Sequence, residues 1–409
     1  MKPLGPIPAG FGAAVDGELV IGGHPVSALV EKAGGTPLFV YSAGMIRDRV
    51  ALLRESLPAR VRLHYALKAN PFPPLLEAMR ALVDGFDIAS AGELELALAA
   101  GQAPAAISFA GPGKRDAELE LAVLRGVTIN LESAGEARRA LLAAERVGTR
   151  PRLAIRVNPA FELRGSGMKM GGGAKPFGVD EAQVPQLARD LIAAGAEWRG
   201  LHVFAGSQAL DALAISEMQA SVLDLAARLT GEIGHALPHL NMGGGFGIPY
   251  FPGDRPLDLA HVSDALAERI GGLPPQLAET ELALELGRYL VGEAGVYLTR
   301  IVDRKESHGA TFLVTDGGLH HVLAASGNFG TVVRRNYPVA IASRFSAEPE
   351  EEASIVGCLC TPLDRLADQA LLPRAEEGDL VAVFCTGAYG ASASPAAFLG
   401  QGPAREMLV

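Results

Sequence analysis

The chain has 409 residues, of which 49% are hydrophobic and 20% are charged, as in a globular protein with two or three domains. Its net charge of −10 argues against a nucleic-acid or anionic-membrane partner. No apolar run approaches the length of a membrane span, the opening MKPLGPIPAG lacks the basic and apolar blocks of a signal peptide, and three cysteines suggest no disulfide framework, so we expect a reduced cytoplasmic enzyme.

Two strand-like segments come first, ELVIGG at 18–23 and TPLFVYS at 36–42, and a helical stretch follows at 45–57. Short apolar runs then alternate with stretches whose apolar residues show helical spacing. The strand candidates are 63–69, 85–90, 106–111, 127–132, 152–158, 199–206, 239–245 and 282–288.

Eight strands with intervening helices over roughly 230 residues predict a (β/α)₈ TIM barrel. The alternative, an open doubly wound sheet, needs a reversal of strand order that the sequence does not reveal. Beyond residue 292, segments such as FLVTDGG and GDLVAVFC read as strands without long helices. We therefore expect a barrel over 42–292 and a β domain formed by 293–409 together with 1–41.

Polar residues and glycines gather where the predicted strands end, which is where barrel enzymes place their chemistry. Surface residues scattered independently would not repeat this placement so often. They are Lys68, Asp87, Ser90, Glu93, Arg156, Asn158, Ser207, Gln208, Gly243, Gly244, Gly245, Glu285, Gly287 and Arg288.

Lys68 lies at the tip of the first barrel strand, within HYALKANP. A lone lysine in such a place most often packs its stem and leaves its ammonium in water. The alternative is a partly desolvated amine that forms a Schiff base with an aldehyde. Lys68 alone does not decide between the two.

The glycine run at 243–245 offers a second indication. Clustered glycines commonly serve turns, but they can also bare backbone N–H groups toward an anion, and this run lies late in the barrel, where phosphate sites usually are. Ser207 and Arg288 could add a hydroxyl and a guanidinium for a phosphate, and Glu285 could hold a protonated ring nitrogen. Together with Lys68, these groups suggest pyridoxal 5'-phosphate.

On these residues the chain resembles the fold-type III pyridoxal-phosphate decarboxylases, the group of diaminopimelate, ornithine and arginine decarboxylases. The motifs that carry the resemblance are HYALKANP, FDIASAGEL around Asp87, RVNP at Arg156, KPFG at 175–178, GSQ at 206–208, GGGFG at 243–247, ELGR at 285–288, CTPLD at 360–364 and GAYG at 387–390. The resemblance implies a barrel plus a β domain, decarboxylation of an amino acid, and a homodimer whose active sites are completed across the interface.

The resemblance also assigns roles at the cofactor. Asp87, Arg156 and Gly287 would belong to the cofactor site, and Tyr389 of GAYG would hydrogen-bond the phosphate. Cys360, from the partner subunit, would help to protonate the intermediate after carbon dioxide leaves. No metal is expected, because Cys358-x-Cys360 with His320 and His321 shows no recognised ligand spacing.

Two departures from the family pattern are informative. Relatives usually stack a histidine on the cofactor ring two residues before the Gly-Ser of the sixth strand; here that residue is Phe204, and His202 lies two residues earlier. Phe204 can stack but does not titrate. Relatives that act on free basic amino acids usually place an acid directly after the motif cysteine, where this chain has Thr361. Burial of an unpaired ammonium is costly, so we do not expect a substrate with a distal amino group.

The CTPLD motif and segment 326–339 would contact the substrate, through Thr361, Asp364 and Arg334. Solvated strand charges are the plain alternative for Arg334 and its neighbour Arg335; the functional reading is a grip on an anion. A subgroup with this look is thought to decarboxylate aminoacyl groups on a carrier. The expectation is therefore a substrate linked to an acyl carrier protein, with the arginines near its phosphopantetheine arm.

Three other functions stay open. The first is a diaminopimelate-type decarboxylase that acts on a free amino acid. The second is an amino-acid racemase on the same barrel, which would favour arginine over Glu285 beside the ring nitrogen. The third is a catalytically silent binding protein, which would have lost cofactor-holding residues that this chain keeps.

Overall fold

The computed structural model describes residues 1–163, 165, 167–327 and 335–409. The chain divides into two compact units. The first, here called the barrel unit, comprises residues 50–247 and 256–287. The second, called the β unit, comprises residues 1–49, 248–255 and 288–409.

The barrel unit contains a closed parallel barrel, as the sequence predicts. Its strands follow one another around the barrel in chain order, and β15 pairs with β5 to close it. They are β5 (Val61–Ala66), β6 (Gly85–Ile88), β7 (Ile107–Phe109), β8 (Thr128–Leu131), β9 (Arg152–Asn158), β12 (Glu197–Val203), β14 (His239–Gly244) and β15 (Glu281–Leu286).

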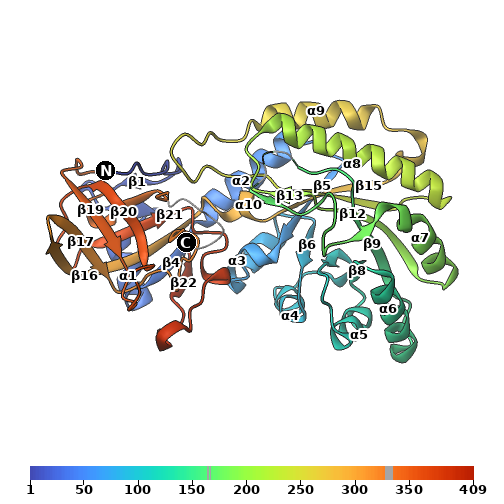
Figure 1. The fold of residues 1–409 in the computed structure, drawn as a ribbon, viewed down its shortest axis with the longest axis horizontal. Coiled ribbons are helices and arrows are strands. Elements are labelled where there is room, and N and C mark those ends of the chain that lie inside the picture. The colour runs from blue at the N-terminus through green and yellow to red at the C-terminus, as the bar shows by residue number, and fades with distance from the viewer. Residues whose placement is uncertain (164, 166, 328–334) are drawn as a thin grey trace. The chain divides into compact units, whose positions relative to one another are not determined.

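Helices cover the outside of this barrel (Figure 1). They are α3 (Pro73–Arg80), α4 (Ala91–Ala99), α5 (Asp116–Arg125), α6 (Ala134–Val147), α7 (Val184–Ala193), α8 (Ala212–Ile233) and α9 (Leu259–Gly271). Several begin at a side-chain cap that satisfies a free backbone N–H: Ser90 accepts from Glu93 N, and Ser133 accepts from Glu136 N. The caps fix each helix start just beyond the carboxyl end of a strand.

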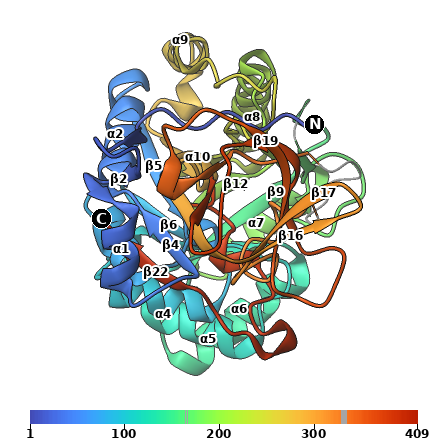
Figure 2. The ribbon, with the colours of Figure 1, turned by 90° about the vertical axis from the view of Figure 1, so that its left-hand side faces the viewer.

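The β unit is built mainly from antiparallel strands in the order β18-β21-β16-β17-β19-β20, with β4 pairing to β16 and β22. In Figure 2 the long strands β16 and β17 lie side by side. The strands are β4 (Leu38–Tyr41), β16 (Gly295–Ser307), β17 (Ala310–Thr315), β18 (Val339–Ile341), β19 (Glu351–Val356), β20 (Arg365–Leu372), β21 (Leu380–Phe384) and β22 (Arg405–Leu408).

The two strand-like segments at the start of the chain have different partners. Segment 36–42 supplies β4, which joins the sheet of the C-terminal strands. Segment 18–23 instead supplies β2 (Leu19–Ile21) in a separate small sheet with β1 (Gly12–Ala13) and β3 (His24–Pro25). This sheet is followed by α1 (Val26–Ala33).

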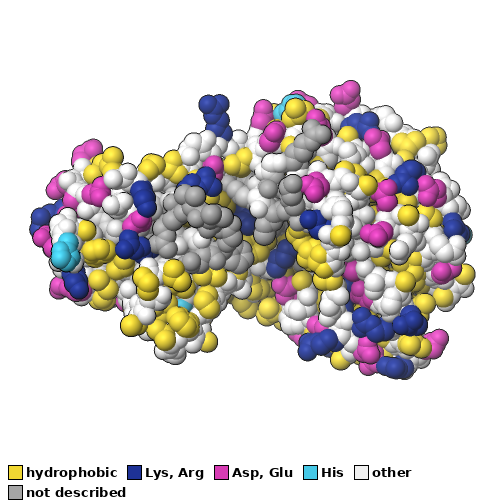
Figure 3. Space-filling model, viewed as in Figure 1, with side chains coloured by type: hydrophobic (Ala, Val, Ile, Leu, Met, Phe, Trp, Pro, Cys, Tyr) yellow, Lys and Arg dark blue, Asp and Glu magenta, His cyan; other side chains and the backbone are white. Residues whose placement is uncertain are grey.

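The remaining elements are short or link the two units. Helix α2 (Ala43–Ser56) contributes residues to both units. The short pieces are α10 (Arg288–Val291), β10 (Met168–Lys169), β11 (Val179–Asp180) and β13 (Gly206–Ser207). On the face shown in Figure 3, basic and acidic side chains are interspersed over the described residues. No described helix has both the length and the apolar character that a membrane crossing requires.

Candidate active site

Lys68 lies immediately beyond β5, in a 3₁₀ turn at Leu67–Ala69. The turn is fixed by Asn70, whose backbone N–H donates to Leu67 O at 3.0 Å and whose side chain accepts from Phe72 N at 3.0 Å. The Lys68 side chain is 43% exposed, and its Nζ lies 3.3 Å from Glu285 Oε1. Lys68 thus lies at the end of a barrel strand, partly exposed and beside a carboxylate. This environment suits an amine that must meet a small ligand at the barrel mouth.

Glu285 is buried near the end of β15 and contacts two basic groups. Its Oε1 faces Lys68, and its Oε2 lies 3.0 Å from His202 Nε2, which can donate to it. Burial alone would raise the pKa of this carboxyl, but the Lys68 ammonium, the hydrogen bond from His202 and the positive charge of Arg156 hold the pKa well below its usual range. Glu285 is therefore an ionised carboxylate in an enclosed place, as a protonated ring nitrogen requires.

His202 is the residue that the sequence reading left without a role. It lies on β12, and β14 separates this strand from β15, so the two side chains meet across the barrel interior. Phe204 follows two residues later, and its ring centre is 5.2 Å from Lys68 Nζ. In the sequence the two-residue spacing within the expected strand 199–206 predicts that both side chains share one face, although β12 itself ends at Val203.

Asp87 also pairs with a histidine inside the barrel. Its Oδ2 lies 3.3 Å from His64 Nδ1, and both side chains are buried. Burial would lower the pKa of His64, but the Asp87 carboxylate raises it above the usual value. The geometry places Asp87 beside His64; its predicted contact with a cofactor stays a prediction.

The backbone at 243–245 lies so close to the backbone of neighbouring segments that only glycine fits there. A Cβ on Gly243 would lie 2.5 Å from Val203 O, one on Gly244 would lie 2.1 Å from Glu285 O, and one on Gly245 would lie 2.4 Å from Gly206 O. Gly243 and Gly245 also have positive φ angles of 70° and 77°. Any side chain here would push apart the strand ends that carry Glu285 and Ser207.

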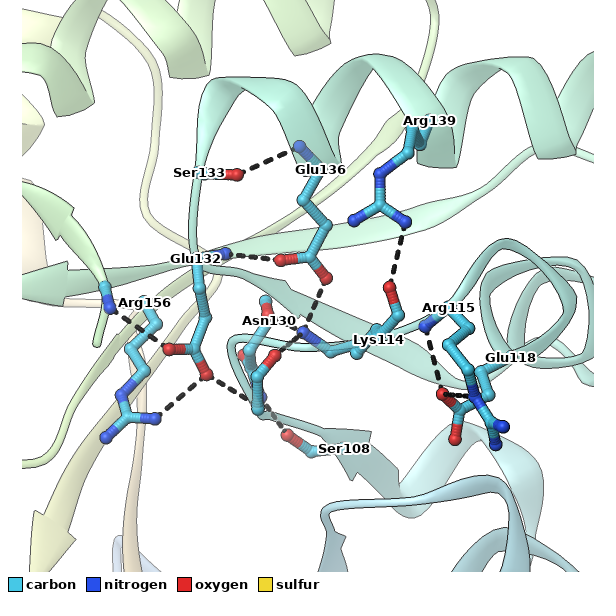
Figure 4. Close-up of polar contacts among 12 residues, drawn as sticks. Ser108, Lys114, Arg115, Glu118, Asn130, Glu132, Ser133, Glu136, Arg139 and Arg156 are labelled. Atoms are coloured by element: carbon cyan, nitrogen blue, oxygen red, sulfur yellow. Dashed lines mark hydrogen bonds and ion pairs between the residues drawn. The ribbon is translucent and has the colours of Figure 1, made fainter. Parts of the chain in front are cut away.

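Arg156 points from β9 toward a carboxylate that the sequence reading did not single out. Its Nη1 donates to Glu132 Oε1 at 2.9 Å (Figure 4), and its guanidinium lies 5.1 Å from the centre of the Phe177 ring. Phe177 belongs to KPFG, so two of the sequence motifs meet at Arg156. Ser207 lies in β13, which pairs with β10.

In the β unit, Arg288 begins α10 directly after Gly287. Its Nη1 donates to the Tyr250 hydroxyl at 2.6 Å, and its guanidinium lies 4.8 Å from the centre of the Tyr389 ring. Burial raises the pKa of Tyr250 to about 12, so its hydroxyl stays neutral and available as a donor. Arg288 Nε is buried with no hydrogen-bond partner in the described part of the chain, a donor that an anionic ligand would satisfy.

The predicted catalytic residue Cys360 and the predicted substrate residues Thr361, Asp364 and Arg334 differ in what they can offer. Cys360 is exposed and Thr361 is partly exposed. Asp364 is buried, and its oxygens accept from Leu319 N at 2.6 Å and Leu359 N at 2.9 Å, so its carboxylate holds two backbone segments together. Arg334 lies outside the described residues. Among the residues that the structure describes, no cluster of His, Cys, Asp and Glu suits a metal ion.

The residues present have the chemistry that pyridoxal phosphate requires. Within the barrel unit, Lys68 is an amine suited to its aldehyde, and Glu285 is an ionised partner suited to its ring nitrogen. Within the β unit, Arg288 has an unsatisfied buried donor suited to a phosphate.

Comparison with known proteins agrees with this chemistry. Residues 43–292 match the pyridoxal-binding domain of pyridoxal-dependent decarboxylases. The L-glutamyl-[BtrI acyl-carrier protein] decarboxylase of Niallia circulans is 35% identical over 91% of this chain and 88% of its own length. The diaminopimelate decarboxylase of Methanothermobacter thermautotrophicus is 34% identical over 92% of this chain and 87% of its own. The structure of Helicobacter pylori diaminopimelate decarboxylase complexed with L-lysine superposes with a TM-score of 0.82 at 26% identity, covering 94% of each chain.

Proposed function

The chain belongs to the pyridoxal-dependent decarboxylases of the ornithine, arginine and diaminopimelate decarboxylase family, and we propose that its substrate is an aminoacyl group whose distal end is linked to a carrier protein. The enzyme is a pyridoxal phosphate-dependent amino acid decarboxylase. The proposal concerns what lies beyond the amino acid's α-carbon, where the relatives differ.

The observation that carries the proposal is the lack of a free carboxylate in the CTPLD motif. Thr361 stands where relatives that take free basic amino acids place an acid, and the motif's own acid, Asp364, is buried with its oxygens on two backbone N–H groups. A distal ammonium would find no counter-charge in this motif, and an unpaired buried ammonium is costly. A neutral thioester at the same place needs no counter-charge.

Two relatives support a distal group that is not an amine. One acts on L-glutamyl-[BtrI acyl-carrier protein], and one from Staphylococcus aureus, 29% identical over 88% of this chain, acts on 2-[(L-alanin-3-ylcarbamoyl)methyl]-2-hydroxybutanedioate. Neither name carries an amino group at the distal end. The diaminopimelate decarboxylases, at similar identity, make a free diamino acid the competing substrate.

The chain's own residues then have these roles. When bound, pyridoxal phosphate supplies a ring that withdraws electrons from the α-carbon of the amino acid. Glu285 would keep a proton on the ring nitrogen, and His202 would keep Glu285 oriented through the hydrogen bond between them. Lys68 would hold the cofactor through its aldehyde until the substrate amine takes its place. Loss of carbon dioxide requires a proton at the α-carbon, which we assign to the Cys360 thiol of a second copy of the chain.

The test compares substrates with the purified holoenzyme. Carbon dioxide release is measured from L-glutamyl carrier protein, from the L-glutamyl thioester of pantetheine, and from free glutamate, diaminopimelate, ornithine and lysine. We expect a carrier-linked aminoacyl group to have a kcat/KM at least about tenfold above any free amino acid, a difference of about 1.4 kcal/mol. Turnover of a free diamino acid at an equal or higher kcat/KM would refute the carrier proposal and leave the decarboxylase assignment intact.

Arg335 is expected to contribute to recognition of the carrier's arm. Its guanidinium stacks 3.8 Å from the centre of the Phe251 ring, and the residue is otherwise exposed, so its hydrogen-bonding edge is available for a phosphodiester. Arg335→Ala should raise KM for the carrier-linked substrate about tenfold with little change in kcat. Arg374→Ala, which removes another exposed arginine of the β unit, is the control. Equal KM values in the two variants would remove Arg335 from substrate recognition.

A further inference from the structure

Two buried ion pairs, Lys114 with Glu136 and Glu132 with Arg156, are joined through the backbone N–H of Glu132, and the four residues are here called the buried charge chain (Figure 4). Lys114 Nζ donates to Glu136 Oε1 at 2.6 Å, and the two side chains are 1% and 2% exposed. Arg156 pairs with Glu132 at 2.9 Å, with side chains 7% and 2% exposed. Burial at this depth removes water as a partner, so each charge depends on its ion-pair partner.

Glu132 ties together three separate segments. Besides Arg156, its Oε1 accepts from Gly111 N at 2.5 Å, and its Oε2 accepts from Gly178 N at 3.1 Å. Gly111 lies between β7 and α5, Arg156 on β9, and Gly178 just before β11. One carboxylate therefore fixes a strand and two loops at the carboxyl end of the barrel.

The segment that Glu132 holds is pressed closely against β9. Gly178 has a φ of +77°, and a Cβ there would lie 2.7 Å from Asn158 N. Phe177 packs under the Arg156 guanidinium, and Asn158 Nδ2 donates to Gly173 O at 2.9 Å. Segment 171–178 thus contacts β9 at the side chains of Arg156 and Asn158.

Lys114 and Glu136 hold Glu132 in place from the other side. Glu136 Oε2 accepts from Glu132 N at 2.9 Å, and Lys114 Nζ also donates to Gly111 O at 2.8 Å and Asn130 O at 2.9 Å. The Lys114 ammonium has three acceptors for its three hydrogens. All three hydrogens of the Lys114 ammonium are therefore hydrogen-bonded, and Glu132 connects the Lys114–Glu136 ion pair to Arg156 at the barrel mouth.

We propose that Glu132 is a positioning residue, which holds Arg156 and the residues 171–178 in the arrangement that binds the cofactor. The inference rests on the proposed function in one respect, the assignment of Arg156 to the cofactor site. Glu132 itself touches neither cofactor nor substrate in this scheme; it acts through Arg156 and Gly178.

The test uses Glu132→Gln, which keeps the side-chain shape and one acceptor but removes the charge opposite Arg156. In the cofactor-free and cofactor-bound protein, amides of 171–180 should exchange hydrogen for deuterium at least about tenfold faster than in the wild type. Pyridoxal phosphate affinity, measured by titration, should fall about tenfold. Glu118→Gln is the matched control, because Glu118 also accepts from backbone N–H groups and an arginine, but these belong to Ala91 and Arg115 and not to Arg156 or Gly178.

A double-mutant cycle shows whether Glu132 acts through Arg156. Arg156→Met alone should weaken cofactor binding, and Glu132→Gln added to it should cause a smaller further loss than Glu132→Gln causes in the wild type. Phe177→Leu, a half-buried position that folding tolerates better, should also speed exchange in 171–180. Wild-type exchange rates in both Glu132→Gln and Phe177→Leu, or fully additive losses of affinity, would overturn the inference. Since neither readout involves substrate, a failure of the carrier proposal would leave these results unchanged.

Discussion

Lys68→Ala is expected to abolish decarboxylation, with a loss on the order of 10³-fold or more in kcat, at least the middle of the range for a positioned acid–base group. Alanine removes the amine that binds the cofactor aldehyde, and it leaves the Glu285 carboxylate without the ammonium 3.3 Å away. The protein should still take up pyridoxal phosphate, because the phosphate and ring contacts remain. Its absorption spectrum should then be that of the free aldehyde at neutral pH.

Two comparison variants separate the covalent role of Lys68 from its charge. Lys68→Arg restores a cation opposite Glu285 but offers no amine, so it should be as inactive as Lys68→Ala and should retain more thermal stability. Lys32→Ala removes an exposed lysine from α1 and should behave as the wild type. A wild-type cofactor spectrum in Lys68→Ala would refute the assignment of this lysine.

The regular alternation of strands and helices made the barrel predictable, because each βα unit carries its own local pattern. The strand ends were less precise: the expected strand over 63–69 ends at Ala66, where the 3₁₀ turn that carries Lys68 begins. Local turn geometry, which Asn70 fixes by side-chain and backbone hydrogen bonds, decides this boundary. The apolar pattern alone does not predict where the strand ends.

Some polar residues at strand ends have local structural roles that the sequence also encodes. Ser90 and Glu93 form a reciprocal cap at the start of α4: Ser90 Oγ accepts from Glu93 N at 3.1 Å, and Glu93 Oε2 accepts from Ala89 N at 2.6 Å. Ser133 and Glu136 repeat the same spacing at α6. The spacing of serine and glutamate three residues apart predicts such a cap, so these polar residues are explained without a ligand.

Contacts between side chains of different strands were beyond the reach of the sequence. His202 meets Glu285 across the barrel interior, 83 positions away, and Glu132 meets Arg156, 24 positions away. Periodicity states which face of a strand a residue occupies, but it does not state which side chain faces it from another strand. Segment 18–23 shows the same limit, since its strand character was clear and its sheet partners were not.

Glu285→Gln is expected to lower kcat about 10²- to 10³-fold, the cost of losing one preorganised electrostatic contact to a developing charge. Glutamine preserves the volume of the buried side chain and can still meet His202, but it cannot hold a proton on the ring nitrogen. The loss should fall mainly on kcat, because the carboxylate's interaction strengthens as charge moves from the α-carbon into the ring. Single-turnover release of carbon dioxide from labelled substrate measures it directly.

Glu285→Gln should also change how the thermal stability of the protein depends on pH. The pKa of Glu285 is lowered in the folded protein, so its ionised form stabilises the fold above the ordinary carboxyl pKa, and this contribution is lost as the pH falls toward the folded-state value. Thermal unfolding of Glu285→Gln should therefore depend less on pH below about 4.3, the usual glutamate pKa, than that of the wild type. Glu281→Gln, at the exposed start of the same strand, is the control. A kcat within threefold of wild type in Glu285→Gln would show that the ring nitrogen is held by another group.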